Sequence, residues 1–177
     1  MARAHEYICQ AGELIFCDSS SSMDRFNTSV FILSTHSVSS GIPLGVILTS
    51  DESEETLLNG LQLLQSILPK NSFFGKGSVG PDVVMIDDSA SERSAISSCW
   101  PQARILLCTF HFLQSQWTWL YEGKNKIHKN DRVVLIHEVR KLVYAGDDNS
   151  LQSLYKNLLN NSTAKKYPHF IKRVNSL

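Results

Sequence analysis

The sequence lacks long apolar runs, which excludes one class of protein. No stretch of 18 consecutive apolar residues occurs, so no transmembrane helix is expected. The first six residues, Met1–Glu6, lack the apolar core of a secretory signal. Apolar residues make up 42 % and charged residues 19 % of the 177 residues, which is typical of a globular domain. We therefore expect a globular protein with no membrane partner.

Cysteine is scarce and shows no framework spacing. The chain has four cysteines, at positions 9, 17, 99 and 108. Small disulfide-stabilised proteins carry a denser and more regular set. We expect four reduced thiols in an intracellular protein.

Net charge is also absent, but the total of zero hides an asymmetry. Residues 1–122 contain 6 Lys/Arg and 13 Asp/Glu, a net charge of −7, whereas residues 123–177 contain 11 and 4, a net charge of +7. We therefore predict an acidic core over residues 1–122 and a basic helical extension over residues 123–177. The basic part either meets phosphate or is a solvated helical surface.

Apolar runs and turn residues predict five strands. Periodicity predicts helices in the remaining segments. The expected strands cover residues 13–18, 28–35, 43–49, 83–86 and 104–108. The expected helices lie around residues 57–68, 89–99, 110–121, 131–145 and 150–159. We expect turns or loops at residues 19–22, 39–41, 75–81 and 146–149.

The element order is three strands, a helix, a strand, a helix, a strand and then helices. A three-strand meander followed by β–α alternation predicts an α/β fold with a mixed sheet flanked by helices. The ribonuclease-H-like fold has this order, and so do unrelated α/β folds.

Two acids occur where expected strands end. Asp18 closes the first strand and Asp87 closes the fourth. In a ribonuclease-H-like sheet these strands are neighbours, so the two carboxylates would converge. Carboxylate oxygens are ligands of Mg²⁺, and a pair of such ions can promote phosphodiester cleavage. Alternatively, each acid is a helix cap or a solvated loop residue. Asp88 could cap the next helix, and Asp24 is expected in a turn.

Four blocks in this order resemble the Mutator-like (MULE) transposases of the DDE group. The first is Asp18 with Ser20 and Phe26, and the next is Pro43–Val46. The others are Ile86–Asp88 followed by Ala95-Ile96 and Trp100–Ala103, and finally Leu107–His111 with its Cys-x-x-His spacing. The first block departs from the family at Ser21, where an aromatic residue is usual.

The resemblance implies a ribonuclease-H-like fold and metal-dependent DNA strand cleavage and transfer. Asp18 and Asp87 would be two of the three catalytic acids and would bind Mg²⁺ or Mn²⁺. The third acid is a Glu after the Cys-x-x-His block. Glu122 is our candidate, with Glu138 or a residue beyond position 177 as alternatives. Without this acid the chain would be a decayed or domesticated domain that binds DNA or protein.

Further expectations concern DNA. His111 could contact DNA phosphate or a metal-bound water, and Lys124, Lys126 and Lys129 could follow a DNA backbone. Cys108 and His111 alternatively form half of a zinc site. The aromatic residues Trp100, Phe110, Trp117 and Trp119 are expected in the core rather than stacked on bases. By resemblance, the partners are terminal inverted repeats and a second copy of the chain, the compartment is the nucleus, and the chain is a fragment of a longer transposase.

Overall fold

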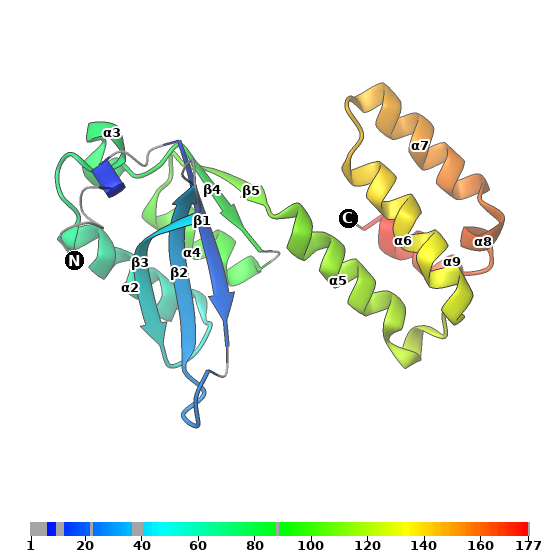
Figure 1. Cartoon of the computed structure of the whole chain (residues 1–177), viewed down its shortest axis with the longest axis horizontal. Helices are drawn as coiled ribbons and strands as arrows, with labels where there is room; N and C mark the ends of the chain where they lie inside the picture. Colours follow the sequence, from blue (N-terminus) through cyan, green and yellow to red (C-terminus); the bar gives the residue numbers. More distant parts are fainter. Residues whose placement is uncertain (1–6, 10–12, 22, 37–40, 88, 177) are drawn as a thin grey trace. The chain divides into compact units, whose positions relative to one another are not determined.

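The computed structural model describes residues 7–9, 13–21, 23–36, 41–87 and 89–176 (Figure 1). The chain forms two compact units, Met1–Cys108 and Thr109–Leu177. Each unit is described by itself below. The predicted boundary at residue 122 falls just after the first long helix of the second unit, and the functional extent of the core stays a prediction.

The first unit is built on a five-stranded mixed sheet with the order β3-β2-β1-β4-β5. Strands β1 and β2 and strands β2 and β3 pair antiparallel, whereas β4 pairs parallel with both β1 and β5. This confirms the predicted α/β architecture with a meander followed by parallel strands. The strands are β1 (Leu14–Ser20), β2 (Ser29–His36), β3 (Gly41–Thr49), β4 (Val83–Ile86) and β5 (Arg104–Leu107).

One face of the sheet carries the core of this unit. Helices α2 (Glu54–Ile67) and α4 (Ala90–Cys99) contribute buried residues to the same cluster as the strands. In β1 the buried residues are Ile15 and Cys17, at alternating positions, and Asp18 between the core-facing positions is exposed. Asp18 therefore belongs to the opposite face of the sheet from the one that α2 and α4 cover.

The start of α2 is set by a serine cap. The Ser53 side chain accepts a hydrogen bond from the backbone N–H of Thr56 and so satisfies one free donor of the first turn. The helix begins at Glu54, and its first turn holds the acidic residues Glu54 and Glu55. Asp51 accepts hydrogen bonds from Ser53.

The glycine-rich connection before β4 is not a plain loop. It contains the short helices α3 (Ser72–Gly75) and η1 (Gly77–Val79). Gly80 follows with a φ of 92°, and a Cβ atom there would lie 2.4 Å from Cδ1 of the buried Trp100. Glycine is therefore required at this position both by the backbone and by the indole.

The serine run after Asp18 was predicted as a turn, and for its first half this was wrong. Ser19 and Ser20 continue β1 and pair with Phe31 and Val30 of β2. The backbone ladder outweighs the weak strand preference of serine. Ser22, Ser39 and Ser40, also expected in turns, lie outside the described residues, and Gly41 already begins β3.

The second unit is helical. The predicted helices after β5 are confirmed, and two short helices near the C-terminus were missed. Buried residues such as Leu120, Leu135 and Leu158 form a second core. Its elements are α5 (Thr109–Tyr121), η2 (Gly123–Asn125), α6 (Lys129–Val143), α7 (Asp148–Asn160), α8 (Ser162–Lys165) and α9 (Pro168–Val174). Among the described helices of the chain, none is long and apolar enough to cross a membrane.

Candidate metal centre

Two carboxylates meet at the end of adjacent parallel strands. Strand β1 pairs with β4 from Leu14↔Val83 to Phe16↔Met85, so two further residues on each strand lead to Asp18 and Asp87. Each offers a carboxylate oxygen, and these atoms lie within 4.8 Å of one another. The predicted convergence of the two acids is confirmed. A single divalent cation can be reached by both side chains.

The surroundings of this pair are strongly negative. Burial raises the pKa of the Cys17 thiol far above its usual value, and the nearby acids Glu92, Asp87 and Asp18 raise it further. A thiol with a raised pKa stays protonated and is a poor nucleophile. Cys17 is therefore a buried core residue, and the acids are the chemically useful groups at this edge of the sheet.

Glu92 is a member of this group that our reading of the sequence missed. It lies in the first turn of α4 with only 2 % of its surface exposed. Burial raises the pKa of its carboxyl to about 7, hydrogen bonds from Ser19 and from the backbone N–H of Asp87 oppose this rise, and the charges of Asp87 and Glu52 add to it. Its Oε2 atom is buried without a hydrogen-bond partner.

A comparison with protein families identifies this architecture. The family model described as MULE transposase domain matches residues 20–115, which are 96 of the 177 residues. The chain belongs to the MULE transposase domain family. A comparison with curated proteins found no match.

Membership in the MULE family relates the sheet to a known fold. This family is part of the DDE group with a ribonuclease-H-like fold, and the observed strand order is compatible with that fold. The matched segment contains Asp87 and begins two residues after Asp18. The chain is therefore related to transposases in function, and its acid pair occupies the edge of the sheet where the sequence predicted a metal site.

The remaining residues that the sequence proposed for the site lie in the second unit. His111 is in the first turn of α5 and is half-buried, whereas Glu122 follows the last residue of the same helix. The rise of a helix over the 11 residues from His111 to Glu122 is about 16 Å. His111 and Glu122 therefore cannot bind the same ion in this structure. Whether either of them takes part in catalysis stays a prediction.

Both glutamates considered as the third acid have lysine partners. The carboxylate of Glu122 lies 2.9 Å from Lys124 Nζ, and this hydrogen bond, with smaller contributions from the Lys124 charge and from Asn125, lowers the pKa of Glu122. Glu138 pairs with Lys141 at 2.7 Å. Each carboxylate is already neutralised by an ammonium group, which a metal ion would have to displace.

The three lysines proposed for DNA binding are exposed and close in sequence. Lys124 lies within η2, Lys126 directly follows it, and Lys129 is the first residue of α6. Their ammonium groups are accessible to a polyanion. The charge of the whole second unit is +6, from 11 Lys/Arg and 5 Asp/Glu between residues 109 and 177.

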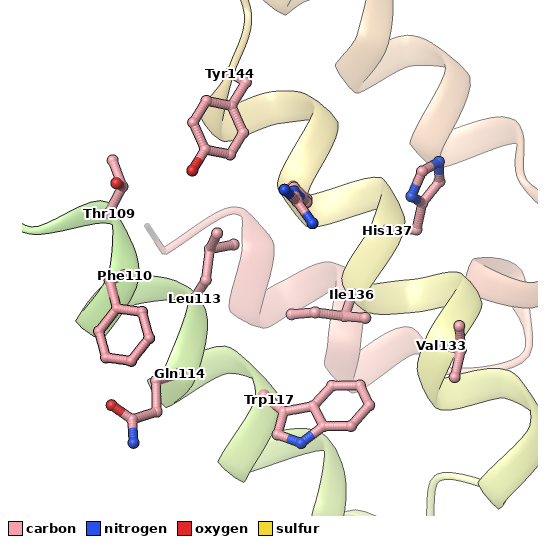
Figure 2. Close-up of a pocket in the computed structure, with 10 residues that line it drawn as sticks. Thr109, Phe110, Leu113, Gln114, Trp117, Val133, Ile136, His137 and Tyr144 are labelled. Atoms are coloured by element: carbon pink, nitrogen blue, oxygen red, sulfur yellow. The ribbon is translucent and has the colours of Figure 1, made fainter.

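The aromatic residues divide between core and surface. Trp100 is fully buried and Trp119 packs against the second core, as predicted. Phe110 and Trp117 instead lie exposed on α5, where the prediction of core packing was wrong. They line a groove of about 660 Å³ between α5 and α6. Figure 2 shows them on α5, with Val133, Ile136, His137 and Tyr144 on α6 across the groove.

Cys108 extends the backbone pairing of the sheet and is not part of a zinc site in the described residues. Its backbone N–H donates to the carbonyl of Ile86, the residue before Asp87. Within the described ranges, Cys108 belongs to no group of three or more potential metal ligands. None of the four cysteines, all of which lie in the described ranges, forms a disulfide bond, as expected. Asp24 is a turn residue, also as expected, because it accepts hydrogen bonds from Phe26 and Thr28.

Proposed function

We propose that this chain carries the catalytic core of a DNA transposase, in which Asp18 and Asp87 bind Mg²⁺ or Mn²⁺. The observation that carries the proposal is the convergence of the two carboxylates at the ends of β1 and β4 in a MULE transposase domain. The donor set fits the cation, because both ligands are hard oxygen anions in an acidic unit. When bound, such a cation would supply Lewis-acid chemistry for phosphodiester cleavage.

The residues of the chain have distinct proposed roles. Asp18 and Asp87 would hold the cation where β1 and β4 end and would offset its charge. Glu122 is the proposed third acid, and for this role it must leave Lys124. His111 comes four residues after Leu107, the end of β5, and we propose that it contacts DNA phosphate or a metal-bound water.

DNA is the proposed partner, through terminal inverted repeats. Exposed lysines at positions 124, 126 and 129 and the +6 charge of the second unit support phosphate contacts. A second copy of the chain as partner and a nuclear location are also part of this proposal. Both rest on the relation to the MULE transposases.

A second candidate function is that of a decayed, non-catalytic domain that binds DNA or protein. The lysine partners of Glu122 and Glu138 favour it, because a third acid ready to bind metal is not identified in the described part of the chain.

Nicking assays separate the two functions. The chain is incubated with DNA that carries terminal inverted repeats, with Mg²⁺, with Mn²⁺ or with a chelator. A catalytic core gives cation-dependent nicks that disappear in Asp87→Ala. DNA binding without nicking under all three conditions supports the decayed domain instead.

A further inference from the structure

We propose that Glu92 is a positioning residue of the acid pair, whose carboxyl holds together the two strand ends that carry Asp18 and Asp87. The inference rests on the proposed function, because it assigns a role within that same site. It concerns a residue of α4 that lies on the other side of the sheet from the Asp18 side chain.

Burial of the Glu92 carboxyl costs free energy, which points to a role other than packing. Glu92 precedes Ala95 and Ile96 by three and four positions, so all three lie on the buried face of α4. A carboxyl in a core loses its hydration, and this loss is offset only by hydrogen bonds. Glu92 Oε2 makes none. An apolar side chain would suit the packing better than this carboxyl does.

The hydrogen bonds of Glu92 indicate what this role is. It accepts one from the side chain of Ser19 and one from the backbone N–H of Asp87. Ser19 directly follows Asp18, and the Asp87 amide belongs to the residue that carries the second carboxylate. The carboxyl group of Glu92 therefore links both strand ends.

The strands need this link at that point. The pairing of β1 with β4 ends at Phe16↔Met85, two residues before the acids. Beyond it, two carboxylates of like charge lie within 4.8 Å of one another, and their repulsion favours separation of the strand ends. A buried acceptor bound to both ends opposes this separation. The carboxylates are thereby held at a spacing that one cation can bridge.

The test uses Mn²⁺ affinity together with thermal stability, both measured on the full chain. Free Mn²⁺ is followed by its electron paramagnetic resonance signal for wild type, Glu92→Met and Glu92→Gln. Methionine fills the same space without an acceptor, whereas glutamine keeps a side-chain carbonyl acceptor. We expect Mn²⁺ affinity to fall at least about tenfold in Glu92→Met, as for other outer partners of metal ligands, and to stay within about threefold of wild type in Glu92→Gln.

Stability distinguishes positioning from simple support of the fold. Because Glu92→Met removes a buried carboxyl with an unmet oxygen, its melting temperature at pH 8 should be no lower than that of wild type. Weaker Mn²⁺ binding in a variant of undiminished stability supports the positioning role. Wild-type affinity in folded Glu92→Met overturns it and leaves the metal centre intact. An equal loss in Glu92→Gln overturns it too, since the charge would then matter rather than the acceptor.

A second pair of variants keeps the test decisive if Glu92→Met does not fold. Ser19→Ala removes the hydrogen-bond partner on β1, and Ser91→Ala is its control, since the Ser91 hydroxyl bonds to Ser89 instead. We expect Ser19→Ala to weaken Mn²⁺ binding about threefold or more and Ser91→Ala to leave it unchanged. Equal affinities for both overturn the inference. Absence of Mn²⁺ binding in wild type overturns the proposed function itself, and the role of Glu92 with it.

Discussion

The hydroxyl of Ser19 donates a hydrogen bond to the carboxyl of Glu92 and so joins the end of β1 to the first turn of α4. Ser19 directly follows Asp18, and Glu92 also accepts from the amide of Asp87. A third carboxyl, that of Glu92, therefore lies near the acid pair on the buried side of the sheet.

The pKa of Glu92 makes stability depend on pH. Burial raises this pKa from 4.5 to about 7, so the folded state favours the neutral carboxyl. The contribution to stability is fully present below pH 4.5 and is lost as the pH rises through 7. The free energy of unfolding should fall by about 2 to 3 kcal/mol over this range through Glu92 alone. Urea titrations at several pH values measure it as the difference between wild type and Glu92→Gln. A difference that is constant with pH would contradict the shift.

Gly80 is predicted to be intolerant of any side chain. A Cβ atom would meet the Trp100 indole at 2.4 Å, and the φ of 92° disfavours every other residue. Gly80→Ala should lower the free energy of unfolding by about 3 kcal/mol or more. Gly75→Ala is the matched control, because Gly75 also has a positive φ, of 82°, but nothing lies within 4 Å of its Cβ position. The control should lose only about 1 kcal/mol. Equal losses in urea titrations would show that the indole does not matter.

The cap of α2 should matter for stability and not for the metal. Ser53→Ala removes the acceptor for the Thr56 amide and the hydroxyl that donates to Asp51. The expected cost is about 1 kcal/mol of unfolding free energy. Mn²⁺ affinity measured at a temperature where the variant is fully folded should equal that of wild type. A loss of affinity would mean that α2 is coupled to the acid pair.

The lysine cluster should determine the salt dependence of DNA binding. A triple variant with glutamine at positions 124, 126 and 129 removes up to three phosphate contacts. The slope of log affinity against log salt should then become shallower by about 3, or by about 2 if Lys124 stays with Glu122. Fluorescence anisotropy with a labelled duplex measures both slopes. Lys156→Gln, an exposed lysine on α7, is the control and should change little. An unchanged slope in the triple variant would exclude these lysines from the DNA interface.

Most of the sheet could be predicted because its strands are short apolar runs bounded by turn residues. The convergence of Asp18 and Asp87 was predictable for the same reason, since acids that end neighbouring parallel strands meet at one edge. Ser19 and Ser20 were misjudged because the ladder with β2, rather than local preference, keeps them extended. Glu92 was not predicted as part of the site. Its spacing to Ala95 and Ile96 placed it on the buried face, and that signal was present in the sequence.

The second unit was less predictable. The helices α8 and α9 have four and seven residues, which is too short for a clear periodic pattern. Phe110 and Trp117 are exposed, although aromatic residues at this density usually mark a core. The third acid stayed undetermined because Glu122 and Glu138 differ from surface glutamates in no local feature of the sequence.

Titration with Mn²⁺ tests the central claim most directly. Isothermal titration calorimetry on the full chain compares wild type with Asp18→Asn, Asp87→Asn and the control Asp24→Asn, whose side chain serves a turn. Loss of a direct ligand should cost at least what loss of an outer partner costs, about tenfold. We predict saturable binding in wild type and the control, and affinities at least about tenfold weaker in the other two variants. Equal binding in all four proteins, or none in wild type, would contradict the account.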